Sequence, residues 1–218
     1  MSAPGLTVWG RRSAFNVQKV LWLAGELGLA HRHVEAGGAH GGLDHPDFLA
    51  MNPHGRVPVI DDAGWVVWES HAILRYLADR HGAAAMWPSD PAARSRSDCW
   101  MDWAQTALQP AFMDLFWGFY RTPEALRNRV AIEDALTRCA RHYALLDRWL
   151  ADRPYLAGER FTLADIPAGT SLYRYLTLEV ERPELPNVRA WYDRLALRPA
   201  YRAHVMAPYD ELRGRTDY

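Results

Sequence analysis

Hydrophobic positions in the first part of the chain change their spacing from one segment to the next. Residues 6–9 are short, apolar and β-prone, which predicts a strand. From Val17 onward, apolar residues recur at steps of three and four, which predicts an amphipathic helix. Ser13 is its expected N-cap and Gly28 its expected end. Residues 31–36 are then predicted to form a second strand.

A glycine-rich loop at 37–42 and one expected helical turn separate this part from the next pair of strands. Those strands are predicted at 57–61 and 65–68, with a tight turn between them, and a helix is predicted from Ser70 to Gly82. The order is therefore β-α-β, a connection, and β-β-α. That order suits a mixed sheet covered by helices and is thioredoxin-like.

Strand signals are absent from the second part of the chain. We therefore expect an α/β and all-α protein with a thioredoxin-like domain at 1–83, a linker at 84–91 and an all-helical domain at 92–218. Thr162 is an expected N-cap with Asp165 as its reciprocal partner, because the spacing is that of a capping box. The helices predicted in this part cover 92–120, 124–150, 162–176 and 187–197.

Composition narrows the class of protein. Hydrophobic residues make up 49% of the 218 residues, which supplies a core, and the net charge of −1 argues against attraction to nucleic-acid phosphates. No apolar run is long enough for a transmembrane helix, and no signal peptide is expected. With Cys99 and Cys139 as the only cysteines, we expect a reducing, cytoplasmic location. His31 and His33 lack a third ligand at a useful spacing, so no metal site is predicted.

One short stretch carries most of the chemistry. Residues 52–60 read NPHGRVPVI, and Glu69-Ser70 opens the next helix. Pro58 lacks an N–H and fits the entrance of a strand. If the Val57–Pro58 bond is cis, the N–H and C=O of Val57 face outward and can pair with an extended peptide. The N–H groups of the helix that starts at Ser70 can hold a carboxylate. Together these features predict a site for a small acidic peptide.

This arrangement resembles the cytosolic glutathione S-transferase superfamily, in particular its serine-type, theta-like bacterial members. The resemblance covers nearly the whole chain. It rests on the domain order and on three motifs that occur in sequence: the Asn-Pro-x-Gly-Arg-Val-Pro run, the Glu-Ser pair and the capping segment at 161–165. The resemblance implies a transferase that ionises the thiol of glutathione for attack on a hydrophobic electrophile. It also implies a cytoplasmic homodimer with glutathione as cosubstrate and without a prosthetic group, a metal, or a nucleic-acid or membrane partner.

The resemblance also implies roles for individual residues. Val57, held by Pro58, would pair its backbone with the cysteinyl part of glutathione. Ser70 would hold the α-carboxylate of the γ-glutamyl group, and Glu69 its ammonium. Arg56 lies within reach of the terminal carboxylate, for which a guanidinium fork is suited. The remaining candidates for this ligand are His40 in the glycine loop and, more weakly, His54.

The residue that activates the thiol is left open between two candidates. The chemistry requires a thiolate, and a donor at a helix N-terminus beside positive charge favours the anion. Ser13 has that place, with Arg11 and Arg12 beside it, and Asn16 is the second choice because the alignment in this loop varies by one or two positions. No tyrosine ends the first strand and no cysteine lies in the loop, which disfavours the tyrosine-type and cysteine-type enzymes.

Aromatic residues crowd the first helix of the second part. Phe112, Phe116 and Tyr120 are the candidates for a pocket that holds the electrophile. The alternative to an enzyme is a non-enzymatic scaffold or regulatory protein with the same fold, although a pure scaffold has no need to keep the complete ligand set. Glutathione-dependent isomerisation or dehalogenation are variants that the sequence leaves open.

Overall fold

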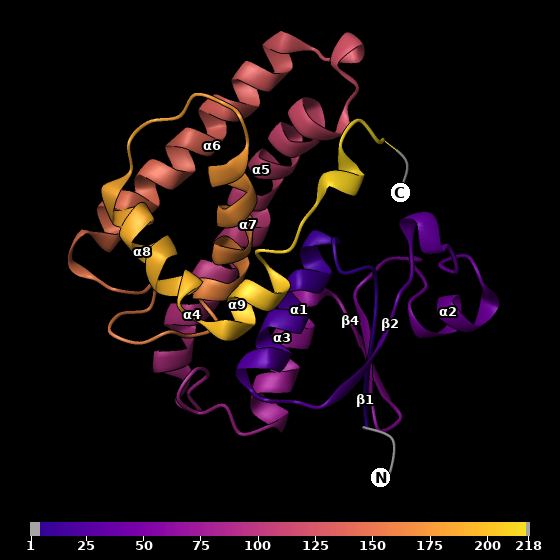
Figure 1. Ribbon diagram of the computed structural model, residues 1–218. Coiled ribbons are helices and arrows are strands. Elements are labelled where there is room, and N and C mark those ends of the chain that lie inside the picture. Colours follow the sequence, from indigo (N-terminus) through magenta and orange to yellow (C-terminus); the bar gives the residue numbers. More distant parts are fainter. Residues whose placement is uncertain (1–4, 217–218) are drawn as a thin grey trace. The chain divides into compact units, whose positions relative to one another are not determined.

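The computed structural model describes residues 5–216, which fall into two compact units (Figure 1). The first unit comprises residues 5–84 together with 199–207, and the second comprises 85–198 together with 208–216. In Figure 1 the strands carry the indigo and purple of the N-terminal sequence, and the helices of the second unit run from magenta to orange. No helix within the described range is long and apolar enough to cross a membrane.

A four-stranded mixed sheet organises the first unit, in the order β2-β1-β3-β4. Strand β1 (Leu6–Trp9) pairs in parallel with β2 (His31–Val34) and antiparallel with β3 (Val59–Asp62). Strand β4 (Trp65–Trp68) completes the sheet as the antiparallel neighbour of β3. The predicted thioredoxin-like order is confirmed. Strand β3 begins after Pro58, which cannot donate a hydrogen bond to the ladder.

Three helices surround this sheet. Helices α1 (Phe15–Glu26) and α3 (Ser70–Arg80) pack together on one face, and α2 (Pro46–Met51) lies on the other, beside the turn Gly38–His40 (Figure 1). Their apolar faces and the sheet form a core in which burial removes side chains from water and stabilises the fold. The fully buried side chains of this core include Val8, Val17, Val20, Ile60, Ile73, Leu74 and Leu77.

The N-cap predicted at Ser13 is wrong. The N-cap of α1 is Ala14, which has extended backbone and no side-chain capping bond. The chain makes a turn first, because the Ala14 N–H donates to the Arg11 carbonyl over 2.9 Å, and helical geometry starts only at Phe15. Ser13 is instead a buried residue of the loop between β1 and α1. The predicted end at Gly28 agrees with the structure, since α1 ends at Glu26.

A short helix from late in the chain belongs to the first unit. Helix α9 (Pro199–His204), which the sequence pattern did not reveal, packs on α1 with the Trp22 and Tyr201 rings 4.7 Å apart. A Cβ added to Gly25 would lie only 2.8 Å from the Cβ of Ala200, so a glycine at this point permits the close approach.

The second unit is helical, and the fold class predicted for it is confirmed. Helices α4 (Pro91–Trp103) and α5 (Gln109–Leu115) are joined and extended by π-helical turns at Ala104–Leu108 and Phe116–Arg121. This continuous segment corresponds to the helix predicted at 92–120.

The next helix begins later than predicted. Helix α6 (Arg129–Trp149) follows a separate short turn at Glu124–Leu126. Asn128 sets its start, because the Asn128 side-chain oxygen accepts a hydrogen bond from the Ala131 N–H at 3.1 Å. The prediction of one helix from residue 124 therefore missed an N-cap. A short turn at Leu150–Asp152 ends the segment.

Helices α7 (Asp165–Thr177) and α8 (Pro186–Ala196) and the turn Asp210–Leu212 complete the second unit. The capping box predicted at Thr162 is formed only in part, because the Asp165 N–H donates to the Thr162 backbone carbonyl and not to its hydroxyl. Thr162 Oγ1 accepts from the Ala164 N–H at 3.2 Å, and Asp165 accepts from the Thr162 N–H at 2.9 Å. The N-cap position itself is Ala164, so α7 starts later than the prediction placed it.

Candidate active site

A buried asparagine shapes the loop that precedes β3. The Asn52 amide donates to the Arg56 carbonyl at 2.8 Å, and its side-chain oxygen accepts from the His54 N–H at 3.1 Å. The Asn52 carbonyl also accepts from the Gly55 N–H at 3.0 Å. These bonds pair the Arg56 carbonyl and the N–H groups of His54 and Gly55 within the loop, and the Arg56 side chain is exposed.

The Val57–Pro58 peptide bond is cis, as predicted. Among the hydrogen bonds of residues 5–216, neither the N–H nor the C=O of Val57 has a partner. Val57 is half-buried, whereas Pro58 is buried at the entrance to β3. One residue therefore presents a backbone donor and a backbone acceptor at the edge of the first unit, which is the pairing pattern that an extended peptide requires.

A glycine brings this loop against the start of α1. A Cβ added to Gly10 would lie 2.4 Å from Cγ2 of Val17 and 2.9 Å from Cβ of Val57. The Gly10 carbonyl also accepts a hydrogen bond from His33 Nε2 at 2.7 Å. The end of β1, the first turn of α1 and the Val57 loop therefore meet at one point. Ser13 and Asn16 belong to the segment between Gly10 and Val17, the two residues that meet at this point together with Val57.

The start of α3 forms the next part of the candidate site. Glu69 is its N-cap and has a positive φ of 68°, an uncommon conformation for a residue other than glycine. The first helical bond runs from the Ile73 N–H to the Glu69 carbonyl, so the preceding N–H groups of the helix are available to a ligand. Ser70 is 4% exposed and the Glu69 side chain is exposed. A strained residue beside free N–H groups is typical of a ligand site.

The two candidate thiol-activating residues differ in their surroundings. Ser13 is buried before α1, while Asn16 lies in its first turn. The Oδ1 atom of Asn16 is buried and accepts no hydrogen bond from the described part of the chain. Both side chains are therefore located where a helix N-terminus favours negative charge.

The positively charged and histidine side chains near the loop between β1 and α1 have different partners. Arg12 and His40 both face Glu35, at 3.5 and 3.8 Å, so the Glu35 carboxylate offsets the charge of the Arg12 guanidinium. Burial, more than any other influence, lowers the pKa of His33, which stays neutral and donates to the Gly10 carbonyl. The Arg11 guanidinium lies beside the glycine loop, since a Cβ on Gly38 would be 3.3 Å from Arg11 Nη1.

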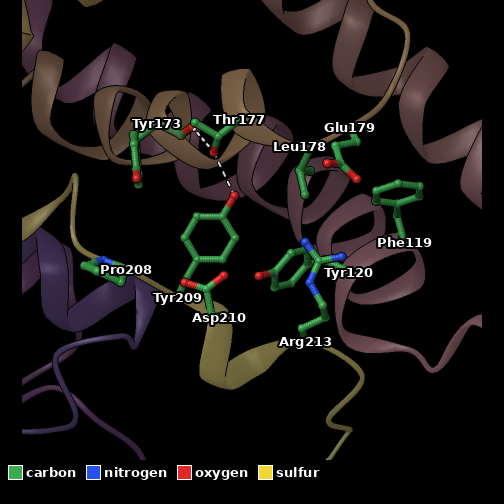
Figure 2. Close-up of a pocket in the computed structure, with 10 residues that line it drawn as sticks. All are labelled: Phe119, Tyr120, Tyr173, Thr177, Leu178, Glu179, Pro208, Tyr209, Asp210 and Arg213. Atoms are coloured by element: carbon green, nitrogen blue, oxygen red, sulfur yellow. Dashed lines mark hydrogen bonds between the residues drawn. The ribbon is translucent and has the colours of Figure 1, made fainter.

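The aromatic candidates belong to the second unit. Phe112, Phe116 and Tyr120 form a stacked column with ring centroids 5.8 and 5.2 Å apart, and all three rings are buried. Of the three, Tyr120 lines a cavity of about 270 Å³ (Figure 2). The predicted role of Phe112 and Phe116 as lining residues finds no support in this cavity, because both rings pack inside the helical core. The cavity is lined by Phe119, Tyr120, Tyr173, Thr177, Leu178, Glu179, Pro208, Tyr209, Asp210 and Arg213.

Residues near the end of the chain complete that cavity. The Tyr209 and Thr177 hydroxyls are hydrogen-bonded at 2.7 Å; Figure 2 marks this bond with the dashed line that joins these two side chains. The Arg213 guanidinium lies 4.6 Å from the centre of the Tyr120 ring, a cation–π distance. Sequence reasoning missed Tyr209 and Arg213, since they follow the last predicted helix and no periodic pattern marks them.

The histidines of β2 bind backbone carbonyls. His31 Nδ1 is 2.9 Å from the Leu29 carbonyl, and His33 bonds to Gly10 as described above. Within the described residues, no group of three His, Cys, Asp or Glu side chains is placed to hold a metal ion.

Comparison with known proteins agrees with both units. The family description "Glutathione S-transferase, N-terminal domain" matches residues 4–79, and "Glutathione S-transferase, C-terminal domain" matches 108–199. Glutathione S-transferase GstB of Escherichia coli is 38% identical over 93% of this chain and 99% of its own length. Human glutathione S-transferase theta-2 is 32% identical over 68% of this chain and 63% of its own length.

A solved structure is also similar. The theta-class glutathione S-transferase of Xanthomonas axonopodis pv. citri, crystallised with glutathione bound, is 48% identical with a TM-score of 0.90. The match covers 94% of this chain and 99% of that one. The resemblance to theta-class members that the motifs indicated is therefore confirmed.

Proposed function

We propose roles for individual residues in the transferase activity of this chain. The chain belongs to the glutathione S-transferase family and is a glutathione transferase. Glutathione is the cosubstrate and lies along the first unit, between the Val57 loop and the start of α3. The observation that carries the proposal is the unpaired backbone of Val57 beside a cis proline, together with the free N–H groups behind Glu69.

Each end of the tripeptide has a complementary group. The backbone of Val57 pairs with the cysteinyl residue in the manner of an added strand, with Pro58 fixing the loop. The Ser70 hydroxyl and N–H hold the γ-glutamyl carboxylate, and Glu69 pairs with the ammonium. Arg56, whose side chain is exposed, and His40, whose side chain is 48% exposed, take the terminal carboxylate.

Ser13 or Asn16 stabilises the glutathione thiolate. A free thiol has a pKa of about 8.5, so a donor at the start of α1 must lower it to make the anion abundant at neutral pH. Ser13 donates its hydroxyl proton directly. Asn16 donates after rotation of its amide, which turns the NH₂ group toward the place that its Oδ1 atom now occupies without a partner.

The electrophile is a hydrophobic molecule held by the second unit. Tyr120 is the residue of the predicted set Phe112, Phe116 and Tyr120 that faces a cavity, and the other two rings support it from behind. The thiolate attacks a carbon atom of the electrophile and a C–S bond forms. In a substitution, the bond from that carbon to the leaving group breaks, and the leaving group departs with the electron pair. In an addition, the π bond of an activated double bond breaks, and its electrons move away from the attacked carbon and are then protonated. No metal or prosthetic group enters this step, because the cosubstrate supplies the nucleophile.

The chain acts as a homodimer in the cytoplasm. Strand β4 is an edge of the sheet that could pair with another chain, and its Trp65 side chain is 64% exposed. Trp149 on α6 is a second exposed ring, in contact with Trp100. Light scattering during size-exclusion chromatography tests this assembly. A mass twice that of the 24.9-kDa chain supports the dimer, and the mass of one chain contradicts it.

Retention on immobilised glutathione, followed by turnover of a generic aryl halide, tests the proposed function. Retention with elution by free glutathione and measurable turnover is the expected result. Retention without turnover of any electrophile would favour the non-enzymatic scaffold. No retention at all would contradict the assignment of the first unit as the glutathione site.

A further inference from the structure

A lysine is completely buried inside the first unit. Lys19 on α1 is 1% exposed, and its Nζ atom lies 3.1 Å from Nε2 of His71 on α3, which is 3% exposed. The ammonium also lies 4.9 Å from the centre of the Phe15 ring. A buried lysine is costly unless its charge is compensated, so its retention among apolar neighbours requires a physical reason.

The positions of Lys19 and His71 suggest a physical reason for the buried charge. Lys19 lies one helical turn beyond Phe15, the first residue of α1, and His71 directly follows Ser70. The hydrogen bond therefore joins the helix that begins beside the thiol-activating candidates to the helix whose start holds the γ-glutamyl group. Since it crosses between the two helices inside the core, it fixes the distance between these two parts of the site.

The pair has a proton that it can lose near neutral pH. Burial lowers the pKa of Lys19 to about 7, and the Glu69 carboxylate opposes that shift. Burial, with the charges of Lys19 and Arg75, lowers the pKa of His71 to about 2. His71 is therefore neutral and accepts from the Lys19 ammonium through Nε2, which places its remaining proton on Nδ1, a buried atom without a hydrogen-bond partner among the described residues.

Two charged groups that act on the pair, Glu69 and Arg75, come from α3. On α9, the other helix packed against α1, the pKa of His204 is lowered by burial and then by Arg12 and the β2 histidines, and Lys19 has no part in that shift. Lys19 is thus a buried group whose charge changes near pH 7 and acts on Glu69.

We propose that Lys19 and His71 are a proton-sensitive pair of positioning residues for the glutathione site. In the protonated state, the charge-assisted bond to His71 and the attraction to Glu69 hold the start of α3, including the positive-φ backbone of Glu69, in its binding geometry. A carboxylate has several acceptor sites, so Glu69 takes the ammonium of the ligand as well. Loss of the proton weakens both interactions, and glutathione affinity falls. This inference rests on the proposed function.

The test measures affinity against pH with a ligand whose sulfur does not ionise. S-methylglutathione is titrated calorimetrically into the wild type, Lys19→Met and His71→Gln over the range from about pH 6 to about pH 8.5, on both sides of the Lys19 transition. Ionisation of the ligand is common to all three proteins and cancels in the comparison. Thermal unfolding establishes that each variant is folded.

We expect the dissociation constant of Lys19→Met to exceed that of the wild type about tenfold at the acid end, with the difference shrinking as pH rises. His71→Gln retains an acceptor near the position of Nε2 and keeps the pH dependence of the wild type. Parallel profiles for the wild type and Lys19→Met overturn the inference.

Two further outcomes are distinguishable. If Lys19→Met does not fold, the comparison of His71→Gln with His71→Leu decides, because the leucine removes the acceptor and is expected to weaken affinity most at low pH. Equal profiles for these two variants also overturn the inference. Absence of any binding by the wild type contradicts the proposed function itself.

Discussion

Gly10 and Val57 approach so closely that no side chain fits between them. A Cβ on Gly10 would lie 2.9 Å from the Cβ of Val57, and the Gly10 backbone has a φ of 138°, which L-residues rarely adopt. Forty-seven residues apart in sequence, the two form the junction between the end of β1 and the loop that carries the free backbone groups of the candidate site. The position of Val57 therefore depends on a glycine in another element.

Gly10→Ala is expected to destabilise the protein by at least about 2 kcal/mol and to weaken glutathione binding, because overpacking and backbone strain add at this position. Chemical denaturation and calorimetry measure the two effects. Gly41→Ala is the matched control, since Gly41 also has a positive φ of 61° but a Cβ there would meet nothing within 4 Å. Equal effects of both substitutions on binding would show that the approach of Gly10 to Val57 does not position the loop.

Ser13→Ala and Asn16→Ala separate the two thiol-activating candidates. Removal of the group that donates to sulfur is expected to raise the pKa of bound glutathione by about one unit or more, toward the value of about 8.5 for a free thiol. The ultraviolet absorbance of the thiolate, followed against pH, measures this directly. We expect the larger shift for Ser13→Ala. If neither substitution moves the titration, both assignments are wrong and another group ionises the thiol.

Asp165 is expected to matter far more for stability than Thr162. The buried Asp165 carboxylate accepts from the Leu156 and Thr162 N–H groups, each at 2.9 Å, and from the Trp191 indole at 3.1 Å. Asp165→Ala leaves three buried donors unpaired and should cost more than about 3 kcal/mol.

Thr162→Ala removes one capping bond and should cost about 1 kcal/mol. Urea denaturation of both variants measures the difference in the free energy of unfolding. Equal losses would contradict the reading of Asp165 as the centre of a hydrogen-bond network. For either variant, we expect activity to fall only as far as the folded fraction falls.

The buried Lys19 also predicts how stability depends on pH. Its pKa is about 7 in the folded protein and 10.5 as the ordinary value, so between these limits the unfolded chain binds a proton that the folded chain has released. Unfolding free energy therefore rises with pH in this window, by up to about 1.4 kcal/mol per pH unit for one proton. Lys19→Met lacks this contribution.

Urea denaturation of the wild type and Lys19→Met at several pH values above 7 measures the difference. The advantage of Lys19→Met over the wild type should be greatest near pH 7 and shrink as pH rises, with other titrating groups cancelling. A difference in unfolding free energy between the two proteins that stays constant with pH would mean that folding does not lower the pKa of Lys19.

Local chemistry made much of the first unit predictable. The sequence NPHGRVP contains the residue types that a cis X-Pro turn and an Asn-stabilised loop require, and the side-chain hydrogen bonds of Asn52 stay within this segment. Glu69-Ser70 similarly marks a helix start by itself. Strands β1 and β4 and helix α3 follow from periodicity and from the glycines and prolines at their ends.

Features that depend on contacts between residues far apart in the chain could not be predicted from the sequence. The constraint on Gly10 comes from Val57, and the burial of Lys19 comes from α3, so neither has a signature in its own segment. Helix α9 has only six residues, and the residue that it contacts, Trp22, is distant in sequence. A periodic pattern of apolar residues therefore did not reveal this helix. The N-cap of α1 was predicted at Ser13 and is Ala14 in the structure. A turn at Arg11 precedes the helix, and residue propensities for capping do not specify that turn.

Calorimetric titration of glutathione into Ser70→Ala, beside the wild type, tests the central claim most directly. Ser70 is buried at the start of α3 and is assigned to the γ-glutamyl carboxylate through its hydroxyl and N–H. Loss of a hydrogen bond to a charged group should weaken binding by about an order of magnitude or more. Unchanged affinity in a folded Ser70→Ala protein would contradict the location of the glutathione site.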